Sequence, residues 1–495
     1  MTVRIDLIKS FSRNRHVALL VVLFCLLAAW NAIKDLFPRV EFVQWLGRGR
    51  ESFSLSEVRE AFVDLFYLTY NDPAKYNARN FSWVFESGIG PICNVNIACI
   101  NTIAFVPVAL YILAIFYILQ HIGCTPLESA IAAIVVLASF PSASILGWQA
   151  TIPDRLAAFL FCLSLAYLYR KLERNDLSLQ NSALTAVIFF CLSLLSVSSK
   201  EAAWILLPIT IILPYLFLPL NFRAISKRIL ITLPAVLFMT FHIIDNYVKT
   251  LKDPHLLGGM PADNFRQLSR YLFQFEHSYV FIILIGIAIA ALLVQIVSNE
   301  QNISQKIFQI RILVVLFIAF VCSWVIPIRT QFASPFYMWL PTGVTIASIL
   351  ILFNFSRFPR TSDRLTYIRR RIQRATVVAL YSLVLATSVY QFPANGGYIL
   401  KIDRNFQESK QELVKYRISH PNYRIGFWAP NSVFIAYQFV SSDPASHFWH
   451  FVGGSNIDDK NYPSQLSNSK CGTVATKTAI AVFDDDFKLV EICSK

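Results

Sequence analysis

The sequence predicts a polytopic, all-α membrane bundle of about eleven transmembrane helices, followed by a small α/β domain outside the membrane. Of the 495 residues, 55% are hydrophobic and only 15% are charged, whereas soluble globular chains carry about 25% charged residues. The apolar residues gather in runs of roughly 16 to 20, the length that crosses a hydrocarbon layer of ~30 Å. Basic residues fall mostly in the connections between those runs. These observations exclude an ordinary soluble domain.

The first apolar run covers residues 17–33, and four basic residues precede it: Arg4, Lys9, Arg13 and Arg15. Secretory signal peptides share that arrangement. This run is long for a signal peptide and many others follow it, so we expect an uncleaved first helix. A polar segment at 35–98 comes next. The later runs cover residues 102–120, 128–146, 154–170, 183–198, 203–219, 229–247, 278–297, 312–328, 339–355 and 375–392.

The basic residues predict the side of the membrane that each connection occupies, because cytoplasmic loops are enriched in Lys and Arg. Alternate connections carry clusters of cations: Arg170, Lys171 and Arg174; Arg223, Lys227 and Arg228; Lys306 and Arg311; and seven arginines within 357–374. We therefore expect a cytoplasmic N-terminus and an extracytoplasmic C-terminus, which for a bacterial inner-membrane protein is the periplasmic side. The net charge of +14 is then a topology signal, and no nucleic-acid partner is expected.

Two domains are expected from this pattern. Residues 1–392 form the transmembrane module, including its first outward loop at 35–98, and residues 393–495 form the extracytoplasmic α/β domain. A tail of about 100 residues can bury a small core of its own. Within it the pattern predicts helices at 403–418 and 432–440, and strands at 423–428, 478–483 and 489–493.

Four of the nine cysteines lie in the polar segments, where an oxidising compartment favours disulfides. Cys471 and Cys493 flank predicted strands, and we predict a bridge between them; the alternative is two unpaired thiols. The same reasoning applies to Cys93 and Cys99, although their close spacing requires a particular turn. The remaining cysteines lie in or beside apolar runs, where cysteine behaves as a small hydrophobe.

Motifs of soluble enzymes are missing from the sequence. It has no phosphate-binding P-loop, so an ATP-driven pump is not expected. The eight histidines are scattered, which argues against a histidine metal site. We assign no metal ligands and no cofactor, although suitable carboxylates leave a divalent metal open.

Polar residues at the outward ends of the apolar runs remain as candidates for chemistry. Ionisable residues at such depth are costly and are functional hypotheses by default. The alternative is that they only pair or extend to the membrane interface. The set comprises Asp35, Glu41, Trp148, Asp154, Arg155, Lys200, Glu201, Arg329 and Tyr337.

Three stretches of the chain resemble GT-C glycosyltransferases. The first is 147–159, Gly-Trp-Gln-Ala-Thr-Ile-Pro-Asp-Arg-Leu-Ala-Ala-Phe, which is similar to the region between the third and fourth spans of that superfamily. The second stretch, 199–208, contains Lys200-Glu201 and then Leu207-Pro208, and it is similar to the lysine–glutamate, leucine–proline signature of the superfamily. The third stretch, 327–341, is similar to the start of a later span in those enzymes. The resemblance covers residues 15–355. Arg155 follows Asp154 here, whereas the family arginine precedes the aspartate.

The resemblance implies an inverting hexosyltransferase that moves a sugar from a polyprenyl-phosphate donor to a polysaccharide or lipid acceptor on the extracytoplasmic face. A carboxylate of the first outward loop would deprotonate the acceptor, with Glu41 preferred and Asp35 in reserve. Cations would stabilise the leaving phosphate, and the candidates are Lys200, Arg155 and Arg329. The remaining substrate-site candidates are Asp154, Trp148, Glu201 and Tyr337.

Other function classes remain open at this point. The layout is also similar to bacterial enzymes that modify the O-antigen of lipopolysaccharide with glucose. An O-antigen polymerase or ligase has a comparable number of spans, but it typically places its large loop late in the chain. A membrane transporter usually shows internal repeats and broken spans near the midplane, and neither is clear in this sequence.

Overall fold

The structure is a computed structural model, and it describes the chain in segments. These are residues 2–35, 80–93, 96–147, 151–174, 179–216, 222–251, 303–329, 335–355, 412–428, 477–484 and 488–494, with short pieces at 265, 405, 408–409, 465–466 and 471. The described residues are mostly helical, and the strands all lie in the C-terminal part.

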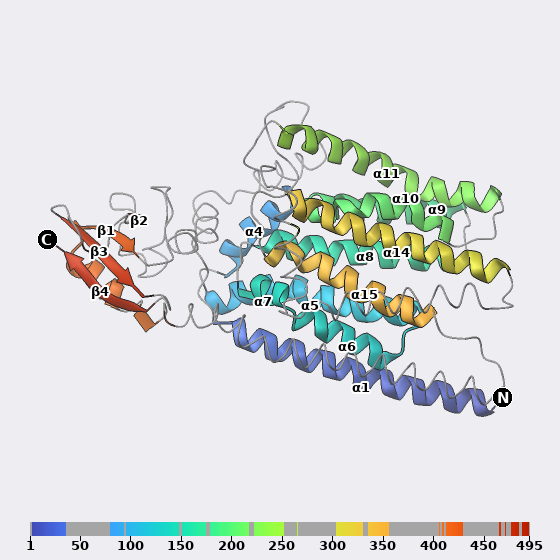
Figure 1. Cartoon of the computed structure of the whole chain (residues 1–495), viewed down its shortest axis with the longest axis horizontal. Helices are drawn as coiled ribbons and strands as arrows, with labels where there is room; N and C mark the ends of the chain where they lie inside the picture. The colour runs from blue at the N-terminus through green and yellow to red at the C-terminus, as the bar shows by residue number, and fades with distance from the viewer. Residues whose placement is uncertain are drawn as a thin grey trace.

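The helices lie side by side along a common direction (Figure 1). They are α1 Thr2–Ile33, α4 Asn80–Cys93, α5 Ile97–His121, α6 Pro126–Leu137, α7 Phe140–Gly147, α8 Ile152–Arg174, α9 Leu179–Val197, η2 Glu201–Ile205, α10 Leu206–Leu216, α11 Phe222–Leu251, α14 Ile303–Arg329, η3 Pro335–Met338 and α15 Trp339–Phe355. Short connections between long helices make sequence neighbours antiparallel, and this brings the start of α8 and the end of α9 to one end of the bundle.

Four described helices are long and apolar enough to cross a membrane: Arg15–Ile33, Ile97–His121, Ile152–Leu172 and Arg228–Val248. Several shorter apolar helices accompany them. Large apolar side chains such as Phe24, Leu237 and Phe317 remain exposed on the outside of the bundle, as expected where lipid is the solvent. The prediction of a helical membrane protein is confirmed at this level. The predicted runs at 278–297 and 375–392 lie outside the described residues.

The predicted single run at 128–146 is wrong in one respect, because two helices occupy it. A capping box starts α6, in which Thr125 accepts from the Glu128 N–H and the Glu128 carboxylate accepts from the Thr125 N–H. The helix ends at Leu137, and α7 begins at Phe140. Pro141 has no N–H to continue the helical ladder, and the Ser139 and Ser142 hydroxyls donate to the Val136 carbonyl instead.

Helices α5 and α15 approach each other closely at one point in the core of the bundle. Tyr111 and Trp339 are both almost fully buried, and their ring centroids lie 4.8 Å apart. A Cβ atom at Gly343 would lie 1.9 Å from the Tyr111 hydroxyl oxygen, so only glycine lets α15 approach α5 this closely.

The C-terminal part contains a four-stranded sheet in the order β2-β1-β3-β4. The strands are β1 Arg424–Trp428, β2 Gln465–Leu466, β3 Thr478–Phe483 and β4 Leu489–Ser494. The β1 strand pairs in parallel with β2 and β3, and β3 pairs antiparallel with β4. The predicted strands are confirmed, as is helix at 412–419 within the predicted 403–418; the predicted helix at 432–440 lies outside the described residues. In Figure 1 the sheet lies beyond the end of the bundle that holds α4 and α7.

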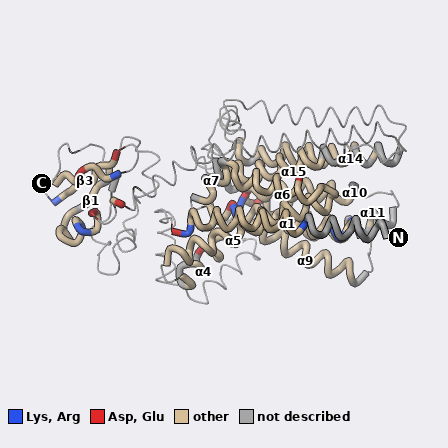
Figure 2. Tube along the Cα trace, turned by 90° about the horizontal axis from the view of Figure 1, so that it is seen from below, with Lys and Arg blue, Asp and Glu red and all other residues tan. Residues whose placement is uncertain are grey.

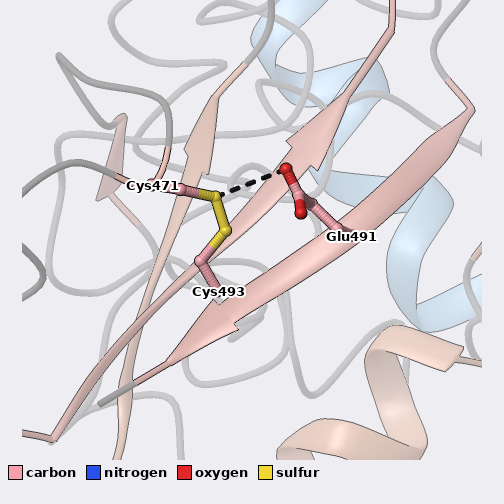
Figure 3. Close-up of side chains that lie close together, drawn as sticks. All are labelled: Cys471, Glu491 and Cys493. Carbon is pink, nitrogen blue, oxygen red and sulfur yellow. Dashed lines mark hydrogen bonds between the residues drawn. A yellow bond between two sulfur atoms is a disulfide. The ribbon is translucent and has the colours of Figure 1, made fainter.

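Both disulfides that the sequence raised as candidates are present. Cys93 and Cys99 are bridged with their Cα atoms 5.4 Å apart, and this bond joins the end of α4 to the start of α5. Cys471 and Cys493 are bridged with their Cα atoms 5.5 Å apart, which ties the segment before β3 to β4 (Figure 3). Both Cα separations lie in the range that a disulfide requires.

Candidate functional site

Charged residues are sparse along the described helices, and they gather toward the ends (Figure 2). A small group of both signs nevertheless lies inside the bundle, close to α7. The start of α8 and the junction between α9 and η2 supply most of this group. Buried charges in an apolar bundle are costly and therefore mark the first place to look for function.

The α9–η2 junction places Lys200 inside the bundle. Helix α9 ends at Val197, and the Ser199 N–H then bonds to the Ser196 carbonyl over 3.1 Å. Lys200 adopts an extended backbone conformation, with φ −164° and ψ 150°, before η2 begins at Glu201. This break in the helical ladder directs the lysine side chain toward the neighbouring α8. Ser196, Ser198 and Ser199 at the end of α9 thus lie next to Lys200, and we call these three serines the serine seam.

Lys200 pairs with Asp154 and faces an aromatic ring. The residue Lys200 is 6% exposed and Asp154 is 4% exposed. The Lys200 Nζ lies 3.6 Å from the Asp154 Oδ2 and 5.7 Å from the centroid of the Tyr337 ring, in a cation–π position. A charge-assisted hydrogen bond spans about 2.7–2.9 Å. The ion pair is therefore looser than a hydrogen-bonded one.

Arg155 is committed to the backbone of neighbouring helices. It is 1% exposed, and its Nη1 donates to the Ala104 carbonyl over 2.7 Å. Its Nη2 donates to the Ile145 carbonyl, and its Nε donates to the Thr151 hydroxyl over 3.3 Å. Arg155 thus joins α8 to α5 and α7. This arrangement favours a structural role for Arg155 over direct contact with a phosphate.

Glu86 is a member of the cluster that the sequence reasoning missed. It lies on α4, within the segment expected as the first outward loop, and it is 4% exposed. Its carboxylate and that of Asp154 both interact electrostatically with the Arg155 guanidinium. The N-terminus of α4 is held in place by the Phe81 N–H, which donates to the Ser198 carbonyl over 3.0 Å. The same serine seam that places Lys200 therefore also positions α4.

The other predicted residues have different outcomes. Asp35 is exposed just beyond the end of α1. Glu201 is half-buried at the start of η2. Arg329 ends α14, but its side chain lies outside the described residues, as do Glu41 and Trp148. The structure thus brings together Lys200, Asp154, Arg155 and Tyr337 from the predicted set, and it adds Glu86.

The cluster balances its own charge, because Glu86 and Asp154 oppose Arg155 and Lys200. Removing an ion from water costs several kcal/mol unless it is paired and hydrogen-bonded. Pairing of opposite charges offsets the cost of burying them. Apolar residues at the same four positions would stabilise a bundle equally well, so stability alone does not account for the cluster. A cluster of this kind can bind an anion at the lysine, and its carboxylates can accept a proton.

Within the described part of the chain, one group of side chains has the spacing of metal ligands: Cys471, Glu491 and Cys493. The two cysteines form a disulfide, and Cys471 Sγ lies 3.5 Å from the Glu491 Oε1 (Figure 3). Thiolate is the form of cysteine that ligates metals, so this bridged pair does not constitute a metal centre.

Comparisons of this chain with protein-family models, with curated proteins and with solved structures found no match.

Proposed function

We propose that this protein is a glycosyltransferase that moves a sugar from a polyprenyl-phosphate donor to a glycan or lipid acceptor at one face of a membrane. The observation that carries the proposal is the buried Lys200–Asp154 pair, with its N–O separation of 3.6 Å, beside Tyr337. A lysine held this loosely can exchange its carboxylate partner for a phosphate oxygen. The resemblance of 147–159 and 199–208 to GT-C enzymes is the reason for proposing that this phosphate belongs to a polyprenyl-phosphate sugar.

The proposed reaction assigns roles to two members of the cluster. A carboxylate takes the proton of the acceptor hydroxyl, and the resulting oxygen attacks the anomeric carbon of the sugar. The bond from that carbon to the phosphate oxygen breaks, and its electron pair stays on the phosphate. Lys200 stabilises the charge that develops there. We assign the role of base to Glu86, because the other carboxylate of the cluster, Asp154, pairs with Lys200. Glu41 is the alternative base.

The finer architecture belongs to the same proposal. We infer that the runs at 278–297 and 375–392 complete a bundle of about eleven spans. The N-terminus is then cytoplasmic and the sheet of the tail, together with helix 412–419, forms an extracytoplasmic α/β domain. The buried cluster lies at the end of the bundle nearer that domain in Figure 1, which is where a polar acceptor would arrive.

The test of the proposal is a transfer assay in membranes with a labelled polyprenyl-phosphate sugar and candidate polysaccharide acceptors. Lys200→Gln removes one charge-assisted contact to phosphate, and contacts of that kind contribute about 1.5–3 kcal/mol. We expect kcat/KM for the donor to fall by roughly 10- to 100-fold. Lys171→Gln, at the opposite end of α8, is the matched control and should retain full activity. Transfer by the Lys200 variant at the rate of the control would contradict the assignment.

A further inference from the structure

A second site lies in the other half of the bundle, where α5, α8, α10, α14 and α15 enclose a groove. The groove has a volume of about 1200 Å³, counting the space at its open side. Its lining is almost entirely aliphatic and aromatic. It begins at Tyr111 and Leu340 and reaches His121 and Arg170 at the far end.

This groove is separate from the buried charge cluster. Tyr111 and Trp339 pack against each other with their ring centroids 4.8 Å apart, and both are almost fully buried. Of these two residues, Tyr111 lines the groove. Among the described residues that line the groove, none belongs to the cluster of Glu86, Asp154, Arg155 and Lys200. An occupant of the groove therefore need not touch the proposed transfer site.

The length of the groove matches one leaflet of a bilayer. Its α5 wall runs from Tyr111 to Ile122, which is about 16 Å at ~1.5 Å per helical residue. Its α15 wall, from Leu340 to Ile351, has the same length. The hydrocarbon core of a bilayer is ~30 Å thick. A groove of this length can hold the part of a lipid chain that lies in one leaflet.

The open end of the groove is cationic. Arg170 lines it and is exposed, and His121 lies beside it at the end of α5. An apolar channel of one-leaflet length with a cation at its mouth complements a hydrocarbon chain attached to an anionic head.

We propose that this groove binds one acyl chain of an anionic membrane phospholipid from the leaflet at this end of the bundle, and that Arg170 contacts its phosphate. A polyprenyl donor fits less well, because its phosphate would lie at Lys200, which does not line the groove. The groove and its cation are independent of the transferase proposal, and only the choice against a polyprenyl chain rests on it. Lipid binding and sugar transfer can therefore be measured and fail independently.

The test uses the full chain in phosphatidylcholine vesicles that contain a small fraction of photoreactive lipid. One probe is a phosphatidylglycerol and the other a phosphatidylcholine, with the same diazirine on the same acyl carbon. Cross-linked peptides are identified by mass spectrometry. One basic residue at a membrane surface favours an anionic lipid by about fivefold. We therefore expect the phosphatidylglycerol probe to label groove peptides of α5, α8 and α15 about fivefold more than the phosphatidylcholine probe.

Two variants with matched controls separate head-group binding from chain binding. Arg170→Gln should abolish the preference for the anionic probe, whereas Lys171→Gln should keep it, because the Lys171 ammonium lies over the Tyr167 ring, 5.6 Å from its centroid, and does not line the groove. Ala347→Trp fills the groove and should reduce labelling at least fivefold, with Ala28→Trp on the exposed side of α1 as control. Ala166→Phe fills the groove from α8 and serves if Ala347→Trp folds poorly.

Three results would overturn the proposal. The first is equal labelling by both probes in the unmodified protein. The second is unchanged labelling in folded groove-filling variants. The third is displacement of the anionic probe by an equimolar polyprenyl phosphate, which would assign the groove to the donor chain.

Discussion

At the scale of single residues, the buried charges are the features that stability alone does not explain. Solvent hardly reaches any of the four charged residues, which are Glu86, Asp154, Arg155 and Lys200. The serine seam adds buried hydroxyl groups next to Lys200. Arg155 donates three hydrogen bonds, to the Ala104 carbonyl of α5, to the Ile145 carbonyl of α7 and to the Thr151 hydroxyl, whereas Lys200 has a loose ion pair. The difference suggests that Arg155 holds the site together and that Lys200 is available to a substrate.

Glu86 is the residue whose role can be tested most directly. Glu86→Gln keeps the shape of the side chain and removes its ability to accept a proton. If Glu86 is the general base of the proposed transfer, turnover should fall by roughly 10²-fold or more. The measurement is the transfer rate per folded molecule, with folding followed by thermal unfolding in detergent.

The same substitution at two other acidic residues supplies the comparison. Glu41→Gln and Asp35→Asn test the carboxylates that the sequence favoured. Asp35 is exposed, and we expect Asp35→Asn to retain activity. Full activity in Glu86→Gln together with a loss in Glu41→Gln would return the base to Glu41 and leave Glu86 as a partner of Arg155.

The sequence predicted part of this site and missed part of it for a definable reason. Lys200, Asp154 and Tyr337 could be named because they stand at the ends of apolar runs within recognisable stretches. Glu86 lies in a segment that was treated as a polar loop as a whole. Between Phe81 and Cys93 it is the one charged residue in an otherwise apolar stretch, and that contrast is the signal that could have identified it.

At the scale of elements, the Cys93–Cys99 bridge is positioned to control α4. It closes a short loop, since the two cysteines are six residues apart in sequence, and Asn96 within that loop caps α5 by accepting from the Cys99 N–H over 3.0 Å. Replacing both cysteines with serine should lower the free energy of unfolding by about 2 kcal/mol on chain-entropy grounds. The measurement is unfolding in detergent, with Cys191→Ser, an unpaired and exposed cysteine, as control.

Activity gives that experiment a second readout. Because α4 carries Glu86, we expect the cysteine double variant to lose transfer activity along with stability. Unchanged stability and activity would mean that the contact of Phe81 with Ser198 positions α4 without help from the bridge.

Element boundaries were predictable where one physical signal dominated. The strand at 478–483 and the apolar helix at 339–355 coincide with β3 and α15, because strong apolar patterning ends at polar or turn-forming residues on both sides. The division of 128–146 into α6 and α7 was not predicted. Hydropathy averaged over a span dilutes Pro141 among its apolar neighbours, whereas the helix responds to its missing N–H.

At the scale of the whole molecule, four cations outside the buried cluster lie at the opposite end of the bundle from that cluster. Arg15 begins the apolar span of α1, Arg170 and Lys171 are near the end of α8, and Arg311 is near the start of α14. Helices α1 and α14 run one way and α8 runs the other, so these residues share one end. Asp154 and Lys200 belong to the opposite end, toward the β-sheet in Figure 1.

This division of charge predicts the orientation of the chain in the membrane. Segments rich in Lys and Arg are retained on the cytoplasmic side, so the N-terminus should be cytoplasmic and the tail exported. Alkaline phosphatase, which is active only after export, should be active when fused after Lys495 and inactive when fused after Arg174, at the cationic end of α8. Equal expression of the two fusions is the control. Activity only in the Arg174 fusion would invert the topology, and it would place Lys200 and Asp154 on the cytoplasmic side, where a lipid-linked sugar destined for an exported glycan could not use them.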